Sequence, residues 1–202
     1  TIATDVSISK DNKYVSFAEI NVSGTLIESS IKTISVEKTK ENAQDSIIYT
    51  YKAENNKLIL RIKYQDKNSL VCMYDDSIDL LQGETNKILY DIQESSFADI
   101  ELKNFIVRIT ENKSGIFKTT NLVEFKNVST DKENLCTIEG AIKNIYTNGE
   151  TVAINLGNEI QFIGTNGWLI KRYITTQEPK DIIIGNGIAG LIYKDKIEII
   201  NL

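Results

Sequence analysis

The sequence contains no histidine, and this absence removes more candidate chemistry than any other feature of its composition. Histidine is the usual general base near neutral pH and the commonest protein ligand of metal ions. Catalytic sites of the Ser-His-Asp and Cys-His types, and zinc sites that use histidine, are therefore excluded.

Cysteine is also scarce, since the chain has only Cys72 and Cys136. Each lies within an apolar strand pattern, where a free cysteine behaves as a small buried hydrophobic residue. A disulfide needs two side chains on neighbouring strands. The repeats described below place the two cysteines in different repeats, so we expect no disulfide between them.

No stretch of the chain carries an excess of positive charge, because Lys and Arg number 23 against 28 Asp and Glu and are scattered among them. A surface that binds nucleic acid needs a basic face to neutralise phosphates, so we expect no nucleic-acid partner. The longest apolar stretch, around residues 182–193, is interrupted by Asn186 and three glycines and is too short to cross a bilayer.

What the chain does have is short strand patterns along its whole length. Apolar and polar residues alternate with a period of two, and no segment keeps a helical period for long. The patterns predict strands over Ile31–Val36, Ala98–Leu102 and Trp168–Ile174, among others. Pro179 is the only proline, so the turns must come from Asn, Asp and Gly clusters. The chain is predicted to be all-β.

The strands fall into a repeat of four. The second strand of each repeat is predicted to begin at Tyr14, Leu70, Phe105, Thr151 and Ile188, with steps of 56, 35, 46 and 37 residues. Four-stranded blades of WD40-like β-propellers repeat about every 40–45 residues. We therefore predict a β-propeller of about five blades, at roughly residues 4–55, 58–95, 97–140, 141–178 and 181–202. A β-sandwich or an open solenoid is the alternative, although a sandwich would alternate more cleanly.

The fifth repeat lacks its fourth strand, and residues 1–3 leave too little chain to supply it from the other terminus. The sequence also begins at Thr1 without a methionine or a signal peptide. We expect residues 1–202 to be either a single propeller domain or the C-terminal part of a larger propeller, with an open arc as the alternative.

Several segments carry a resemblance to a known family, chiefly Asp5–Tyr14, Leu70–Asp76, Asn166–Tyr173 and Ile188–Lys196. The chain resembles the C-terminal part of an uncharacterised family of Gram-positive bacterial proteins, classed as a domain of unknown function. The resemblance implies a membrane anchor upstream of the chain, further propeller-like repeats and an extracytoplasmic location. It implies no catalytic residues.

Two groups of residues stand out as candidate sites, and each has a plainer interpretation that we favour. Trp168 follows the Asn166-Gly167 turn, as in the tryptophan corners of quinone-dependent propellers, but a single such corner predicts a packing residue between blades. Asp75, Asp76 and Asp79 cluster near a turn, but their spacing matches no calcium loop, so a solvated turn is predicted.

Other motifs receive no functional role. The triplets that begin at Asn21, Asn112 and Asn127 fit the glycosylation pattern by chance in a chain rich in Asn, Ser and Thr. Residues 171–173 (Lys-Arg-Tyr) could stack on a base or a sugar, but are expected to face solvent. Residues 185–187 (Gly-Asn-Gly) are predicted to form a hairpin turn, because no helix follows to complete a phosphate-binding loop.

Two classes of function remain open. We predict a non-enzymatic scaffold at the bacterial surface that binds a protein or another cell-surface ligand, with no catalytic, cofactor-binding or metal-binding residues and no cofactor. The alternative is a propeller enzyme that acts on glycans, or through a bound cofactor, with carboxylate chemistry. Acidic side chains with shifted pKa values at a channel mouth would favour the enzyme, and exposed apolar patches would favour the scaffold.

Overall fold

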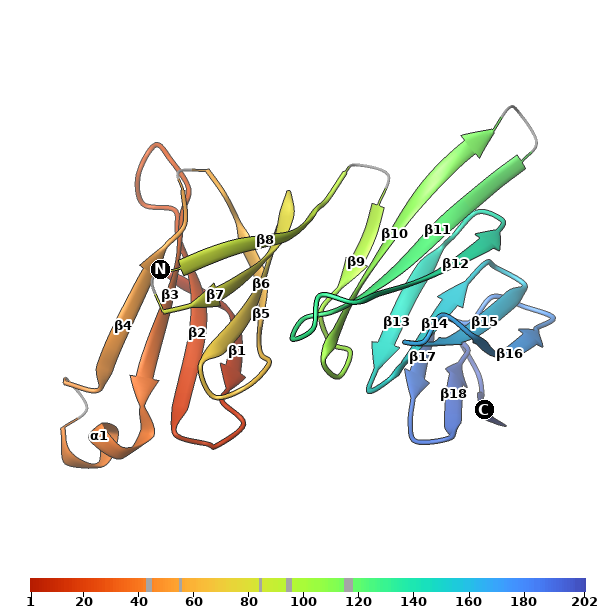
Figure 1. Ribbon diagram of the computed structural model, residues 1–202. Coiled ribbons are helices and arrows are strands. Elements are labelled where there is room, and N and C mark those ends of the chain that lie inside the picture. The colour runs from red at the N-terminus through yellow and green to blue at the C-terminus, as the bar shows by residue number, and fades with distance from the viewer. Residues whose placement is uncertain (43–44, 55, 84, 94–95, 115–117) are drawn as a thin grey trace. The chain divides into compact units, whose positions relative to one another are not determined.

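The computed structural model describes residues 1–42, 45–54, 56–83, 85–93, 96–114 and 118–202, with only the backbone at residues 113, 114 and 118. The chain divides into two compact units, Thr1–Gln93 and Glu94–Leu202. Within the described residues it forms five antiparallel sheets, and in each sheet neighbouring strands are consecutive in the sequence (Figure 1). The predicted all-β fold is confirmed.

The first unit contains two four-stranded sheets. Sheet 1 consists of β1 (Ile2–Ile8), β2 (Tyr14–Asn21), β3 (Glu28–Ser35) and β4 (Ile47–Lys52). Sheet 2 consists of β5 (Ile59–Tyr64), β6 (Ser69–Tyr74), β7 (Ser77–Gln82) and β8 (Thr85–Asp91).

The second unit contains the remaining three sheets. Sheet 3 consists of β9 (Ser96–Asp99), β10 (Phe105–Ser114), β11 (Lys118–Asn127) and β12 (Glu133–Glu139). Sheet 4 consists of β13 (Asn144–Asn148), β14 (Thr151–Asn155), β15 (Glu159–Gly164) and β16 (Leu169–Ile174). Sheet 5 has three strands, β17 (Asp181–Ile184), β18 (Ile188–Ile192) and β19 (Ile197–Asn201).

A short helix, α1 (Val36–Glu41), interrupts the strands of sheet 1. The sequence predicted a strand that continues to Val36, but β3 ends at Ser35, whose side chain caps the helix by accepting a hydrogen bond from the Lys38 backbone N–H at 3.3 Å. The helix buries no residue and has only six, so it carries no apolar period that could have predicted it.

The strand β9 lies two to three residues before its predicted position at Ala98–Leu102. The Asp99 carboxylate accepts a hydrogen bond from the Glu101 backbone N–H at 2.7 Å, and this local turn ends the strand. Ile100 and Leu102 are fully buried, although they follow the strand in an irregular segment. Leu102 forms only an isolated parallel bridge, to Gly149 at the turn between β13 and β14, so the apolar alternation reflected burial rather than pairing within sheet 3.

Sheet 4 is covered on both of its faces. Val152 and Ile154 pack into a cluster with residues of sheet 3, whereas Ala153 and Phe162 pack into a cluster with residues of sheet 5. Successive strand residues point to opposite faces, so β14 must be apolar at consecutive positions to fill both clusters. This explains the unbroken apolar run in its sequence.

Sheets 1 and 2 are joined by hydrogen bonds as well as by apolar packing. The Asp5 carboxylate accepts from the Ile62 backbone N–H at 2.8 Å, and the Ser7 hydroxyl accepts from the Tyr64 backbone N–H at 2.9 Å. Both side chains belong to β1, and both N–H groups lie on the edge strand of sheet 2. Side chains of one sheet thereby satisfy backbone donors that the neighbouring ladder leaves unpaired.

Candidate functional site

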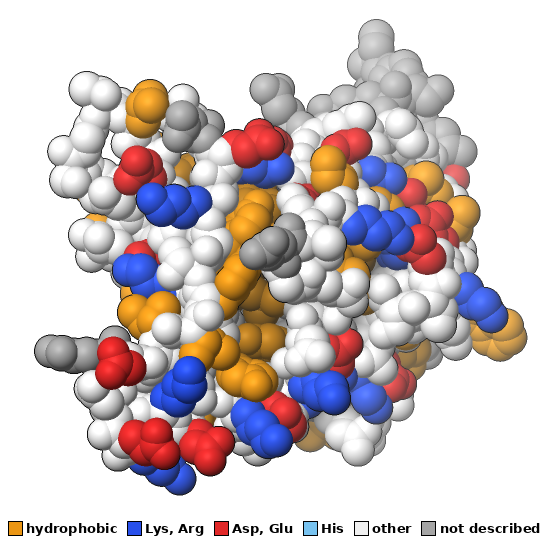
Figure 2. All heavy atoms as spheres, turned by 60° about the vertical axis from the view of Figure 1, so that its left-hand side comes forward, with side chains coloured by type: hydrophobic (Ala, Val, Ile, Leu, Met, Phe, Trp, Pro, Cys, Tyr) orange, Lys and Arg blue, Asp and Glu red, His pale blue; other side chains and the backbone are white. Residues whose placement is uncertain are grey.

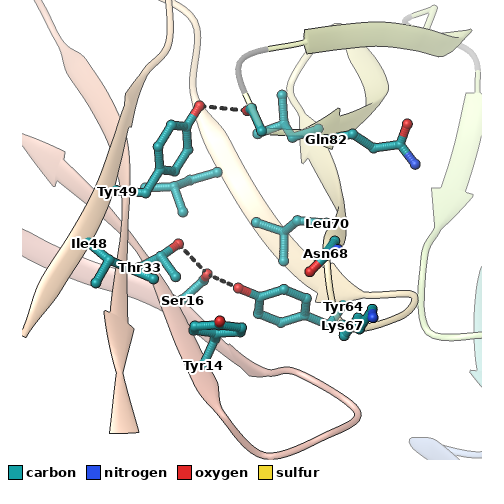
Figure 3. Close-up of a pocket in the computed structure, with 13 residues that line it drawn as sticks. Tyr14, Ser16, Thr33, Ile48, Tyr49, Tyr64, Lys67, Asn68, Leu70 and Gln82 are labelled. Carbon is teal, nitrogen blue, oxygen red and sulfur yellow. Dashed lines mark hydrogen bonds between the residues drawn. The ribbon is translucent and has the colours of Figure 1, made fainter. Parts of the chain in front are cut away.

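A cavity of about 570 Å³ lies between sheets 1 and 2, with side chains of β2, β3 and β4 on one side and side chains of sheet 2 on the other (Figure 3). Three tyrosines line it: Tyr14 at the start of β2, Tyr49 on β4 and Tyr64 at the end of β5. We call this cavity the tyrosine pocket. Figure 2 shows hydrophobic side chains gathered on the surface among scattered charged ones.

A chain of three hydroxyl groups crosses the wall of the tyrosine pocket. The Ser16 hydroxyl lies 2.7 Å from the Thr33 hydroxyl and 2.8 Å from the Tyr64 hydroxyl (Figure 3). Ser16 is fully buried and the other two are almost fully buried. The chain satisfies three polar groups that burial would otherwise leave without partners, and it fixes the orientation of the Tyr64 ring.

The remaining wall of the pocket is mainly aliphatic. Ile31, Leu70 and Leu81 are buried and belong to the cluster between the two sheets, whereas Ile48 is 41% exposed and lies on the outermost strand β4. Ligand pockets typically combine such apolar walls with a small number of placed polar groups.

The rim of the pocket is polar and comes from two turns of sheet 2. Lys67 and Asn68 belong to the turn between β5 and β6, and Gln82 and Gly83 lie at the end of β7. The Tyr49 hydroxyl donates to the Gly83 carbonyl at 2.8 Å and so bridges the two sheets. Lys67 is the only charged residue among those that line the pocket.

The sequence did not predict this pocket, because its tyrosines are far apart in the chain and each fits an ordinary strand pattern. What brings Tyr14, Tyr49 and Tyr64 together is the packing of sheet 1 on sheet 2. The alternating polarity around each tyrosine predicts a strand. It does not predict a pocket, because strands that line no pocket show the same alternation.

Trp168 does not have the role that the sequence predicted. It was expected to pack between blades, but its side chain is 76% exposed. It precedes β16, the outermost strand of sheet 4, where no described neighbouring sheet covers it. A packing role for this tryptophan is therefore wrong for the described part of the chain.

The acidic cluster near the β6–β7 turn is only partly the solvated turn that was predicted. Asp75 is exposed and accepts from the Leu58 backbone N–H at 3.0 Å. Asp79 is 1% exposed on β7, where its Oδ2 accepts from the Asn86 amide at 2.8 Å. Asp79 is thus a buried strand residue. It is paired with Cys72 of β6, so its side chain lies on the face of sheet 2 that packs against sheet 1.

Lys57 balances the charge of this acidic cluster. Its Nζ lies 3.2 Å from Asp76, 4.0 Å from Asp79 and 4.5 Å from the centre of the Tyr74 ring. Partial burial lowers the pKa of Lys57, but the hydrogen bond to Asp76 and the charge of Asp79 outweigh it, so the pKa is raised. The lysine occupies the place that a cation would take among these carboxylates.

The charged residues of β16 make contacts on the surface of the second unit. Arg172 pairs with Glu159, and the Tyr173 hydroxyl donates to the Glu198 carboxylate. That hydrogen bond raises the pKa of Tyr173 to about 12. Arg172 is exposed, as predicted, whereas Tyr173 is half-buried against sheet 5.

The glycosylation-like triplets and the glycine turn have ordinary structural roles. The Asn21 and Asn127 side chains accept hydrogen bonds from backbone N–H groups two residues on, at 3.2 and 3.0 Å. The side chains of the last two residues in the triplet at Asn112 lie outside the described residues. Residues 185–187 form the predicted hairpin turn, with Gly187 at φ +72°.

Both cysteines are free thiols, as expected. Cys72 is fully buried on β6 and Cys136 is half-buried on β12. Burial raises the pKa of both thiols, and that of Cys72 strongly. Neither thiol has the lowered pKa that marks a nucleophilic cysteine.

Three carboxyl groups of the described residues, those of Asp11, Asp66 and Glu159, have lowered pKa values. Hydrogen bonds from Ser9 and Arg172 lower the pKa values of Asp11 and Glu159, respectively. Burial raises the pKa of Asp66, but hydrogen bonds from Asn68 and Ser69 outweigh it and the pKa is lowered. A general acid needs the opposite shift. The described residues contain no group of three or more Cys, Asp or Glu that could hold a metal ion.

Comparison with solved structures identifies the architecture of the five sheets. The chain is similar to Hsv2 of Kluyveromyces lactis, with 12% identity over 98% of this chain and 74% of that one and a TM-score of 0.61. It is also similar to the β-propeller domain of the trilobed protease of Pyrococcus furiosus, with 12% identity over 99% and 71% of the two chains and a TM-score of 0.60. The WD40 domain of Neurospora crassa Pan2 gives 10% identity, coverage of 98% and 62%, and a TM-score of 0.55.

These similarities confirm the predicted β-propeller fold. At 10–12% identity they carry the fold alone and say nothing of ligands or activity. Within the described residues, none of the helical structure is long or apolar enough to pass through a bilayer. No curated protein matches the sequence.

A family defined from sequence matches nearly the whole chain. Its description reads as a family of unknown function, and the match extends over residues 3–202. The match covers all five sheets of the propeller. The chain belongs to the DUF5711 family.

Proposed function

We propose that this chain is a non-enzymatic β-propeller scaffold that binds a protein ligand, and that an apolar side chain of the ligand enters the tyrosine pocket. The observation that carries the proposal is the pocket itself. It joins apolar walls and three tyrosines to a polar rim in a volume of about 570 Å³, and pockets of this size accept a large side chain or a small molecule.

The walls of the pocket suit an apolar anchor. Tyrosine is enriched among the residues that dominate protein-binding energies, because it offers a large rigid surface with a polar tip. Tyr49 and Tyr64 have their hydroxyls fixed by hydrogen bonds to Gly83 and Ser16. Their rings are therefore oriented before a ligand arrives, which reduces the entropy lost on binding.

The rim of the pocket suits a peptide backbone. Asn68 and Gln82 carry amides that can both donate and accept hydrogen bonds, and both are exposed. Lys67 adds one positive charge with no carboxylate among the lining residues. This charge disfavours a cationic anchor and favours a neutral or acidic segment.

The electrostatics support a binding role over the enzymatic alternative. Among the described residues, Asp11, Asp66 and Glu159 have lowered rather than raised pKa values, and Asp66 precedes Lys67 at the rim of the pocket. Lowered values keep a carboxylate ionised and make it a poor proton donor near neutral pH. The tyrosine pocket also contains no carboxylate pair that could act on a glycosidic bond.

We propose an extracytoplasmic location, with the protein held at the membrane by a segment outside this chain. The support is the resemblance of segments such as Asp5–Tyr14 to a family of membrane-anchored proteins. Intact cells treated with an added protease should lose the native protein while a cytoplasmic marker survives. Protection of the native protein to the same degree as the marker would contradict this location.

The binding proposal is tested with a matched pair of substitutions on β4. Ile48→Trp places a large ring in the tyrosine pocket, whereas Ile47→Trp makes the same change at an adjacent exposed residue that does not line it. A random dodecapeptide phage library serves as the probe for wild-type protein. Peptides enriched on it should contain a large apolar residue.

The affinities of the enriched peptides for the two variants decide the outcome. Fluorescence polarisation should show binding to Ile47→Trp that matches wild type. Binding to Ile48→Trp should be at least about tenfold weaker, because the pocket that takes the anchor is filled. The proposal fails if no peptide is enriched, or if both variants bind like wild type.

A further inference from the structure

A second hollow lies in the second unit, where the turns of three neighbouring sheets meet. Its volume is about 880 Å³, and its lining includes Asn148-Gly149 from sheet 4 and Asn186-Gly187 from sheet 5. Asn166, which begins a third Asn-Gly pair, also lines it beside Trp168. We call this hollow the Asn-Gly groove. It is independent of the tyrosine pocket, which lies in the first unit.

The Asn-Gly groove is held together by contacts between the sheets. The backbone N–H of Lys103 donates to the Gly149 carbonyl, and the Asn148 amide donates to the Ile184 carbonyl. The Asn134 amide of sheet 3 donates to the Thr165 carbonyl at 2.8 Å. These hydrogen bonds link sheets 3, 4 and 5 through residues that line or adjoin the groove, so its shape is set before any ligand binds.

The turn that carries Trp168 is also tightly fixed. Gly167 has φ +81°, and a Cβ at this position would lie 3.1 Å from the Leu135 carbonyl oxygen. The Asn166 side chain accepts from the Trp168 backbone N–H, and the Trp168 carbonyl accepts from the Gly164 N–H, both at 3.0 Å. The backbone of Trp168 is therefore held in place by hydrogen bonds, while its side chain is 76% exposed.

Apart from the tryptophan, the groove is mainly polar and carries balanced charge. Lys103 and Glu150 form an ion pair at 3.4 Å, and they are the only charged residues in the lining. A groove for phosphate or another polyanion would have an excess of positive charge. Besides Trp168, only Leu169 and Ile170 contribute apolar side chains. The ligand that fits is uncharged, rich in hydrogen-bonding groups and flat on one side.

We propose that the Asn-Gly groove binds a neutral oligosaccharide, with one sugar ring stacked on Trp168. A pyranose ring presents C–H groups on one face, which pack on an indole, and hydroxyl groups around its edge. The amides of Asn148, Asn166 and Asn186 and the exposed backbone of the turns provide donors and acceptors for these hydroxyls. A protein ligand is less well matched, because only Leu169 and Ile170 add apolar side chains beside Trp168 and the rest of the lining is glycine or polar.

Trp168 is the only tryptophan of the chain, so its fluorescence reports the proposed site directly. The full chain is titrated with cellotetraose, chitotetraose, maltotetraose and mannotetraose. At least one of these sugars should shift the emission to the blue in a saturable way and protect it from acrylamide, because the exposed indole becomes covered. Unchanged emission and quenching with all four sugars would overturn the proposal.

Substitutions then test whether the indole itself binds the sugar, with calorimetry as the readout. Trp168→Ala should weaken binding by about tenfold or more, as the loss of an aromatic stacking surface does elsewhere, and Trp168→Phe should retain most of the affinity. Ile174→Ala is the control, since Ile174 is exposed at the end of β16, the strand that follows Trp168, but does not line the groove. Equal binding by wild type and Trp168→Ala, or binding of a protein but no sugar at this surface, would overturn the proposal.

The two proposals fail separately in these experiments. Ile48→Trp, which fills the tyrosine pocket, should leave the affinity for the sugar unchanged, because the two sites share no residue. If Ile48→Trp abolished sugar binding, the assignment of the sugar to the Asn-Gly groove would be wrong.

Discussion

The chain of hydroxyls in the tyrosine pocket allows a quantitative test of how the pocket is built. Ser16 lies between Thr33 and Tyr64 at 2.7 and 2.8 Å and, among the described residues, joins their hydroxyls to each other. Ser16→Ala therefore breaks two hydrogen bonds at once and leaves two nearly buried hydroxyls without this partner. Tyr64→Phe breaks one hydrogen bond and leaves Ser16 bonded to Thr33.

The expected loss in the free energy of unfolding follows from the number of hydrogen bonds that each substitution breaks. A hydrogen bond contributes about 1 kcal/mol to the free energy of unfolding, and a stranded buried polar group costs about 1–3 kcal/mol. Tyr64→Phe should therefore cost about 1 kcal/mol, and Ser16→Ala about 2–4 kcal/mol. The triple variant Ser16→Ala, Thr33→Val, Tyr64→Phe strands no hydroxyl, so it should be more stable than Ser16→Ala alone by about 1–2 kcal/mol.

Urea unfolding followed by circular dichroism measures these differences through the midpoint, provided that the slope of the transition is the same in all variants. The reasoning is refuted if the triple variant is less stable than Ser16→Ala. That result would mean that the three hydroxyls do not depend on one another.

Three further predictions concern the thiols, the tyrosine paired across sheets 4 and 5, and the open face of sheet 5. In the native protein Cys72 should resist a thiol reagent and Cys136 should react slowly, because burial raises the pKa values of both thiols. Both thiols should react at once in denaturant. Rapid labelling of Cys72 in the native protein would contradict its burial. The pKa of Tyr173 is raised to about 12 by its hydrogen bond to Glu198, so the stability it contributes is complete below pH 10 and is lost as the pH rises toward 12. Alkaline denaturation should accordingly be less steep in Tyr173→Phe, and an identical profile would argue against that hydrogen bond. Ile199 is 72% exposed on β19, so Ile199→Ser should reduce any self-association seen by light scattering, and unchanged association would place the contact elsewhere.

The sequence predicted the strands well because their signals are local. Alternation and turn residues are read from neighbouring positions, and the predicted strand starts at Tyr14, Thr151 and Ile188 are those of the structure. The helix at Val36–Glu41 was missed because its formation depends on one cap at Ser35 and on no apolar face.

The functional surfaces were less accessible to sequence reasoning, because they depend on which strands face one another. The tyrosine pocket joins Tyr14 of β2, Tyr49 of β4 and Tyr64 of β5, which lie 35 and 15 positions apart in the sequence. Asp79 was expected in a solvated turn, but its register on β7 buries it. Trp168 was expected to pack between blades, because large aromatic residues usually do. It is exposed because its turn lies at the edge of sheet 4.

Site-specific photocrosslinking on β4 tests the central claim, that a protein ligand enters the tyrosine pocket, most directly. Benzoylphenylalanine is placed at Ile48, which lines the pocket, or at Ile47, which does not, and the native protein is irradiated in cells that produce it. We predict one dominant crosslinked protein from position 48 and little or none from position 47. Crosslinks of equal yield to the same proteins from both positions, or none from position 48, would contradict the account.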